Sequence, residues 1–266
     1  MAGPFAPELL VEDGANGVRL VTLNRPEALN AANQRLHEHL AKVWTYLAED
    51  DAARAVVITG AGEAFSAGGD MHHLVHLRQD RSLRRREIAD ARRMVQAMID
   101  CPLPIVAAVN GPAVGLGCNL AILSDVVLIA ENAYLADPHV SIGLTAADGG
   151  APIWPTLVGL LRAKEYLLTG DRIPAQRAVE FGLATRSVSH EDLHAEALRV
   201  AYRLAAQPMH ALRTTKRALN LHIARAMSGI LEYALAEEFA SFDTEEHQKV
   251  VDSFVARSSR PSEPCS

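Results

Sequence analysis

Residues 64–70 read AFSAGGD and residues 115–118 read GLGC, and these two glycine-rich turns decide how the rest of the chain is interpreted. Each turn follows a short apolar run, at 55–59 and 105–109, and precedes a stretch with helical character. Both therefore place backbone N–H groups at the start of a helix, where they lack intrahelical partners and the helix dipole favours negative charge. Two such turns facing each other would bind a developing oxyanion. A single turn is better explained by glycines that permit a tight connection.

The order of apolar runs and helical patterns predicts an α/β fold. Strands are expected at 19–23, 55–59, 105–109 and 126–130, and helices at 33–48, 71–99 and up to about 123. Asn33 is suited to cap the first helix, and strands that alternate with helices in this way favour parallel pairing. After Gly149-Gly150 the segments read as helices, at 155–169, 174–181, 190–206 and from 208 onward, and residues 258–266 are expected to be a frayed end. We therefore expect an α/β core followed by an all-helical tail.

Composition argues against several classes of protein. The chain has 266 residues, of which 49% are hydrophobic, enough for one α/β domain with a substantial core. Its net charge of −6 argues against nucleic acid as the main partner, because phosphate binding requires a basic surface. No apolar run reaches the ~18 residues of a membrane-spanning helix, and residues 1–11 do not resemble a secretory signal. Cys101, Cys118 and Cys265 are too scattered for a disulfide framework or a zinc site. We therefore expect a soluble, cytoplasmic protein that binds neither membrane nor metal.

Two local clusters of basic residues leave alternatives open. Residues 78–93 are rich in arginine, which fits either a solvated helix face or a site for a phosphorylated ligand or an acidic surface. His72 and His76 are spaced to share one side of a helix. No carboxylate pattern accompanies them, so we expect no metal there.

Further motifs accompany the two turns in a fixed order. They are NRP at 24–26 with ALN at 28–30, FSAGGD at 65–70, IVAAVNG at 105–111, GLGC at 115–118 and LTGD at 168–171. With these motifs the chain, from about residue 9 to 257, resembles the crotonase (enoyl-CoA hydratase/isomerase) superfamily. The resemblance implies a crotonase-like spiral of ββα units over residues 1–200 and a helical C-terminal trimerisation region over 201–266. It also implies a homotrimer or dimer of trimers in fatty acid metabolism, with coenzyme A as part of the acyl-CoA substrate and no separate cofactor.

The resemblance also assigns roles to residues by position. The backbone N–H groups of Gly69 and Leu116 would form the oxyanion hole, in which loss of one donor typically costs ~3 kcal/mol of transition-state stabilisation. Backbone near Ala28, Ala67 and Gly69 would hold coenzyme A, with Asp70 beside the adenine.

The sequence departs from the hydratases of this family at two positions. Those enzymes use two glutamates, and the matching positions hold Asn119 and His139. Asn119 can orient water or substrate but has no proton to exchange near neutral pH, whereas His139 can act as a base and then as an acid. We expect Asp148 to hydrogen-bond the His139 ring and fix its tautomer, and Glu238 to supply a further carboxylate.

Residues 139–155 also resemble a smaller branch of the superfamily, the β-diketone hydrolases of the 6-oxocamphor hydrolase type. Those enzymes pair a histidine with an aspartate at these positions and carry a glutamate near Glu238. Three functions therefore stay open. The leading one is a hydro-lyase-like enzyme that acts on an acyl-CoA thioester through an enolate. The second is retro-Claisen hydrolysis of a cyclic β-diketone without coenzyme A, in an apolar cavity lined by residues such as Trp154. The third is a catalytically weak acyl-CoA-binding protein.

Overall fold

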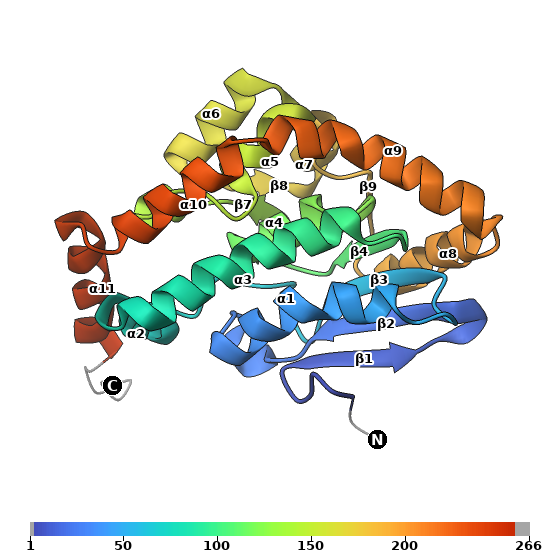
Figure 1. The fold of residues 1–266 in the computed structure, drawn as a ribbon, viewed down its shortest axis with the longest axis horizontal. Helices are drawn as coiled ribbons and strands as arrows, with labels where there is room; N and C mark the ends of the chain where they lie inside the picture. Colours follow the sequence, from blue (N-terminus) through green and yellow to red (C-terminus); the bar gives the residue numbers. More distant parts are fainter. Residues whose placement is uncertain (1–2, 259–266) are drawn as a thin grey trace.

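The main sheet of the protein has six strands and occupies the right-hand part of the molecule in the view of Figure 1. The structure, a computed structural model, describes residues 3–258, so Cys265 and all but the first residue of the expected frayed end lie outside the described residues. The strands, in their order across the sheet, are β1 (Leu9–Asp13), β2 (Val18–Leu23), β3 (Ala55–Gly60), β4 (Ile105–Val109), β6 (Val126–Ala130) and β9 (Arg186–Val188). Only β1 and β2 pair antiparallel, and the other neighbours are parallel. The predicted parallel pairing is therefore confirmed.

Strand β4 is buried along its whole length and β3 along most of it, as expected for parallel strands covered on both faces. Helices α1 (Gln34–Ala48) and α3 (Arg81–Asp100) lie side by side across the sheet in this view, and α8 (Leu193–Ala205) packs against β3 and β4 (Figure 1). The predicted N-cap of α1 is confirmed, because the Asn33 side chain accepts a hydrogen bond from the Leu36 N–H at 2.9 Å.

The helix predicted at 71–99 is two helices, α2 (Met71–Gln79) and α3. The chain breaks at Asp80, whose carboxylate accepts hydrogen bonds from the N–H groups of Ser82 and Leu83 at 2.8 and 3.0 Å. Asp80 therefore caps a new helix, which the continuous helical pattern concealed. The short strand β1 was also missed by the sequence analysis.

A smaller sheet brings the second glycine-rich turn to the segment that carries His139. It consists of β5 (Ala113–Val114), β7 (Tyr134–Ala136) and β8 (Ile173–Pro174). Helix α4 (Leu116–Ile122) begins directly after β5, and the 3₁₀-helix η3 (His139–Ile142) follows β7; two further 3₁₀-helices are η1 (Ala15–Gly17) and η2 (Pro26–Ala28). Gly115 N–H donates to the Ala136 carbonyl at 2.8 Å, so the start of α4 and the residues before His139 are held together.

The expectation of an all-helical tail after residue 150 is wrong. The helices are α5 (Gly150–Val158), α6 (Leu160–Thr169), α7 (Ala175–Phe181), α8, α9 (Met209–Met227), α10 (Ile230–Ser241) and α11 (Glu245–Ser258). Between them β8 joins the small sheet and β9 joins the main sheet beside β6. Both strands are too short for a periodic pattern to reveal them. The helix predicted at 155–169 is also broken, at Gly159, which has a φ of 79°.

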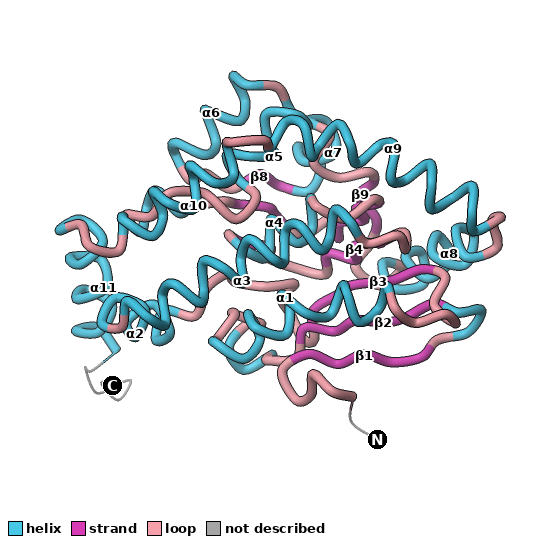
Figure 2. The backbone as a smooth tube through the Cα atoms, viewed as in Figure 1, coloured by secondary structure: helices cyan, strands magenta, loops and turns pink. Residues whose placement is uncertain are grey.

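Helices α9, α10 and α11 arch over one side of the molecule (Figure 2). Helix α10 packs on α3 and α5, and α11 packs on α2 and η3. A small apolar cluster formed by Leu74, Leu77, Leu83, Leu144 and Phe242 lies where these elements meet, apart from the main core. Within residues 3–258 no helix combines the length and apolar character needed to cross a bilayer.

Candidate active site

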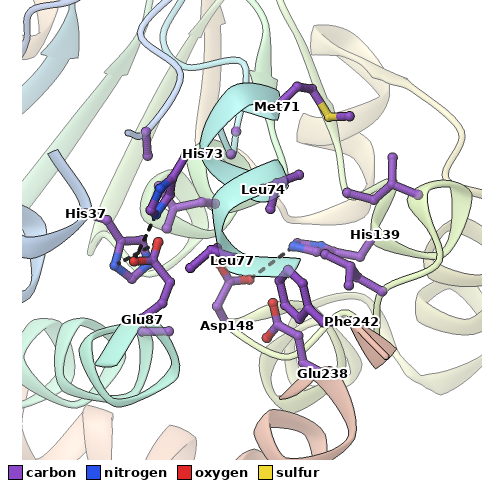
Figure 3. A pocket seen from close by; sticks show the side chains of 18 of the residues that line it. His37, Met71, His73, Leu74, Leu77, Glu87, His139, Asp148, Glu238 and Phe242 are labelled. Atoms are coloured by element: carbon purple, nitrogen blue, oxygen red, sulfur yellow. Dashed lines mark ion pairs between the residues drawn. The ribbon is translucent and has the colours of Figure 1, made fainter. Parts of the chain in front are cut away.

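A cavity of about 200 Å³ lies where the two glycine-rich turns, η3 and helices α1, α2, α3 and α10 converge (Figure 3). Both predicted oxyanion donors, Gly69 and Leu116, line it, as do His139, Asp148 and Glu238. The rest of the wall is largely apolar. A mostly apolar cavity with a few converging polar groups is typical of a small-molecule site.

Hydrogen bonds of Asn30 and Ser66 join the first glycine-rich turn to the ALN motif and to the second turn. Asn30 is fully buried at a φ of 57°, and its amide donates at 2.8 Å to the carbonyls of Ala61 and Ala64. The Ser66 hydroxyl donates to the Asn30 carbonyl at 2.9 Å, and the Ser66 carbonyl accepts from Val114 N–H at 2.9 Å. The ALN and FSAGGD motifs are thus parts of one scaffold.

Glycine is required where these turns approach each other. A Cβ atom at Gly117 would lie 2.6 Å from the Ser66 Cβ, and one at Gly68 would lie 2.8 Å from the Val114 carbonyl oxygen. Among residues 3–258, no protein acceptor is found for the N–H of Gly69 or of Leu116. Two unpaired N–H groups that flank one cavity are the arrangement needed to bind an oxyanion.

His139 lies between two carboxylates. Its Nδ1 hydrogen-bonds Asp137 Oδ1, and its Nε2 lies 3.8 Å from Asp148 Oδ1. Burial alone would lower the pKa of His139, but the charge and hydrogen bond of Asp137 outweigh it, and with Asp148 and Glu238 they raise this pKa to about 10. At neutral pH the ring is therefore an imidazolium with a proton on Nε2, facing the cavity.

Asp137, rather than the expected Asp148, makes the hydrogen bond that fixes the His139 ring. This role of Asp137 was not predicted from the sequence, although the residue stands two positions before the histidine in Asp137-Pro138-His139. The Asp137 carboxylate is buried, so only groups of the protein can supply its hydrogen bonds. The closeness of Asp137 to His139 in the sequence was the feature from which this pairing could have been predicted.

Asn119 is fully buried behind Asp148 and is not part of the cavity wall. Its amide donates to Asp148 Oδ1 at 2.8 Å and to Asp137 Oδ2 at 3.4 Å. Instead of facing water or substrate, as expected from the sequence, Asn119 positions the two carboxylates that flank His139.

Glu238 reaches the same cavity from α10. Burial raises its pKa to about 8, with Asp148 adding to the rise and His139 opposing it. Burial likewise raises the pKa of Asp148, against the opposing charge of His139. The site therefore holds a charged donor at His139, an acceptor at Asp148 and a carboxyl at Glu238 that keeps its proton near neutral pH.

A sequence model described as enoyl-CoA hydratase/isomerase matches residues 13–261 of this chain. The chain belongs to this family. A crystal structure of an enoyl-CoA hydratase/isomerase from Mycobacterium paratuberculosis is 53% identical, covers 92% of this chain and 98% of its own, and superposes with a TM-score of 0.90. The 1,2-epoxyphenylacetyl-CoA isomerase of Escherichia coli is 30% identical over 95% of this chain and 97% of its own. The crotonyl-CoA hydratase of Syntrophomonas wolfei is 34% identical over 84% of this chain and 87% of its own.

The residues expected from the enoyl-CoA hydratase/isomerase family to hold coenzyme A lie along two adjacent segments. Ala67 N–H donates to the Leu29 carbonyl at 2.9 Å, which brings the turn of η2 beside the first glycine-rich turn. Ala67 and Gly69 line the cavity, whereas Ala28 and Asp70 do not. The Asp70 carboxylate pairs with Arg25 Nη1 at 3.0 Å and caps α2 by accepting from His72 N–H.

In the arginine cluster at 78–93 only Arg84 is buried, and most of the other arginines are exposed. Arg84 is fully buried and donates to the carbonyls of Leu77 and Arg78 and to Asp243. Arg92 pairs with Glu232 of α10. The acidic partners of Arg84 and Arg92 therefore belong to the same chain.

Two other features of the sequence lie outside the cavity. His72 and His76 are exposed, and no group of residues able to hold a metal is found within 3–258. Trp154, expected in the cavity wall, is completely buried in the main core and does not line the cavity.

Proposed function

We propose that the chain is an acyl-CoA enzyme that stabilises an enolate between the N–H groups of Gly69 and Leu116 and moves protons with His139 and Asp148. One observation carries the proposal. A proton donor and a proton acceptor, 3.8 Å apart, share a cavity with two unpaired backbone amides. A Cβ atom at Gly115, the residue before Leu116, would lie only 3.5 Å from the His139 ring, so the donor lies directly beside the second turn.

Hydration of an enoyl-CoA can be written with these groups. The thioester oxygen accepts from both amides, and Asp148 takes a proton from water as the hydroxyl adds to C3. The resulting enolate is held by the two amides and by the nearby imidazolium charge. His139 then gives its Nε2 proton to C2, and the proton on Asp148 passes to His139. Asp137 keeps Nδ1 of the ring protonated and oriented throughout, as the carboxylate of a catalytic triad does.

Loss of enoyl absorbance from crotonyl-CoA tests the proposal, with wild type compared with His139→Ala and Asp148→Ala. Wild type should turn over, and each variant should lose about 10²-fold or more of kcat while still binding the CoA ester. Full activity in His139→Ala would contradict the proposed mechanism. Tight binding of CoA esters without turnover by wild type would favour a binding protein.

Hydrolysis of a cyclic β-diketone is the second candidate, and the position of Glu238, which lines the same cavity as His139 and Asp148, favours it. Water attack on one carbonyl, with its proton taken by Asp148, would cleave the C–C bond and leave an enolate at the same amides. Glu238 or His139 would then protonate the carbon. Turnover of a cyclic 1,3-diketone without coenzyme A, with crotonyl-CoA unchanged, would establish this reaction.

We propose further that the chain forms a homotrimer or dimer of trimers through the helical region at 201–258. Leu219, Leu221, Ile230 and Tyr233 on α9 and α10 expose between 45% and 68% of their surface. Apolar side chains gathered on neighbouring helices are a common feature of subunit interfaces.

A further inference from the structure

A second group of ionisable residues lines the cavity and has no part in the proposed reaction. His37 comes from α1, His73 from α2 and Glu87 from α3, and all three belong to the cavity wall. In Figure 3 they lie together on one side of α2, across from His139, Asp148 and Glu238. Three separate helices thus bring polar groups to one place in a largely apolar wall.

The hydrogen-bonding capacity of this group is not used up within the protein. Glu87 Oε1 lies 3.5 Å from His37 Nδ1, and Glu87 Oε2 lies 3.2 Å from His73 Nε2. Neither contact has hydrogen-bond geometry, so both ring nitrogens are buried without a partner. The two histidines are only 6% and 7% exposed.

Burying polar groups in this state is costly. An unsatisfied buried donor or acceptor destabilises a protein, and apolar residues of the same size would join the three helices better. Because the carboxylate has up to four lone-pair sites and each neutral imidazole has one donor and one acceptor, an incoming oxygen can be satisfied here. The arrangement therefore fits a ligand better than a purely structural contact.

The charges around the cavity indicate what kind of oxygen would bind. The charge of Glu87 adds to the rise in the pKa of Glu238, so this group and the residues of the proposed reaction interact across the cavity. An anionic ligand bound at this group would be repelled by the adjacent Glu87 carboxylate. The positive charge of His139 lies across the cavity, and that of Arg84 is paired with Asp243. A neutral oxygen carries no such penalty. A ketone can accept a hydrogen bond from an imidazole N–H, and a hydroxyl can in addition donate to the Glu87 carboxylate.

We propose that His37, His73 and Glu87 form a subsite for a neutral oxygen, a hydroxyl or a ketone, on the acyl group of the substrate. The inference rests on the proposed function, because it places the acyl chain in this cavity. The substrate class is then an oxygenated acyl-CoA rather than an unsubstituted fatty acyl-CoA. The cavity volume of about 200 Å³ suits a short acyl group, since pockets for drug-sized ligands occupy roughly 300 to 1,000 Å³.

Calorimetric binding of saturated acyl-CoA esters, which have no double bond to hydrate, tests the subsite. The probes are 4-oxopentanoyl-, 5-oxohexanoyl- and 6-oxoheptanoyl-CoA, each compared with the unsubstituted ester of the same chain length. At least one oxo ester should bind about tenfold more tightly than its partner, equivalent to about 1.4 kcal/mol. Adipoyl-CoA, with a terminal carboxylate, should bind more weakly than 5-oxohexanoyl-CoA.

His73→Leu should abolish the oxo preference while leaving the affinity for hexanoyl-CoA unchanged within about threefold. His76→Leu is the matched control, because it makes the same change on an exposed part of α2. His37→Leu is a second variant should His73→Leu not fold, and it too should weaken the preference, because it removes the other imidazole donor.

The outcomes separate the subsite from the proposed function. Equal affinity of wild type for every oxo and unsubstituted pair would overturn the subsite but leave the acyl-CoA assignment standing. A preference for adipoyl-CoA would also overturn it. Failure to bind any CoA ester would instead remove the proposed function, and the subsite with it.

Discussion

Three carboxyl groups from different parts of the chain set the ionisation of His139. Asp137 hydrogen-bonds the ring from the end of the small sheet, Asp148 faces Nε2 from the loop before α5, and Glu238 approaches from α10. Their combined charge keeps the ring protonated at neutral pH despite its burial. The resting site is therefore prepared to donate a proton rather than to remove one.

Asp137→Asn should lower the pKa of His139 from about 10, because it removes the largest interaction that raises it. A titration of the histidine ring by NMR would measure this change directly. Activity should fall by about 10²-fold or more, since the ring loses both its orientation and the support for its charge. Asp171→Asn, an exposed carboxylate, is the control. An unchanged His139 titration in Asp137→Asn would contradict the assigned pairing.

Stability should fall as pH rises, because Glu238 and His139 both bind protons more tightly in the folded protein. The stabilising contribution of the Glu238 proton to the folded state is fully present below the ordinary pKa of 4.5, and it is lost as pH rises to about 8. The loss is about 1.4 kcal/mol per pH unit for one group. The corresponding contribution of the His139 proton is fully present below pH 6.5, and it is lost as pH approaches about 10.

Glu238→Gln should therefore flatten the dependence of unfolding free energy on pH. Denaturant unfolding between pH 5 and 6.5 isolates the effect, because His139 is protonated in both states in most of that range. Equal slopes for wild type and variant would show that Glu238 ionises normally in the folded protein.

At the scale of elements, the separation of the two glycine-rich turns depends on the contact between Gly117 in α4 and Ser66 in the first turn. A Cβ atom at Gly117 would also lie 2.7 Å from the Ser66 carbonyl oxygen. That carbonyl accepts the hydrogen bond from Val114 N–H that joins the turns. The position of Leu116 N–H relative to Gly69 N–H is thus fixed by backbone packing rather than by a side chain.

Gly117→Ala should destabilise the protein by about 1 to 3 kcal/mol, the usual cost of overpacking a core. In an ordinary helix the same substitution would stabilise by about 0.5 to 1 kcal/mol. Urea unfolding of wild type and variant shows whether the substitution lowers or raises the free energy of unfolding. With crotonyl-CoA as substrate, kcat should fall more than affinity, because the two amides no longer fit one oxygen. A more stable variant with unchanged kcat would show that the turns do not need this close contact.

At the scale of the whole molecule, the C-terminal helices both complete the site and expose apolar surface. Helix α10 supplies Glu238 and Phe242 follows it, so residues beyond 201 close the cavity formed by the earlier part of the chain. The same helix exposes Ile230 and Tyr233. Assembly through this region would therefore also support one wall of the site.

Light scattering after gel filtration should give three or six times the chain mass of 28.7 kDa. Tyr233→Glu combined with Leu221→Glu should reduce the measured mass, because charge is rarely tolerated in the buried centre of an interface. Lys42→Glu, an exposed charge change on α1, should leave it unchanged. A monomeric wild type at micromolar concentration would contradict the proposed assembly.

Features that depend on neighbouring residues in the chain were determined by the sequence itself. The helix at 34–48 with its Asn33 cap, the strands at 105–109 and 126–130, and the two turns that precede α2 and α4 match the structure. Local hydrogen bonds and apolar periodicity decide these elements, so their residues are sufficient to predict them. Motif order also indicated the family.

Only the tertiary structure decided which distant groups meet. Strand β9 joins the main sheet beside β6, Asn119 is enclosed by carboxylates, and His37, His73 and Glu87 converge from three helices. Even the partner of His139 was decided in this way, because Asp137 and Asp148 are both near it in the chain. Which oxygen meets Nδ1 depends on the direction in which η3 leaves the small sheet, and packing of whole elements sets that direction.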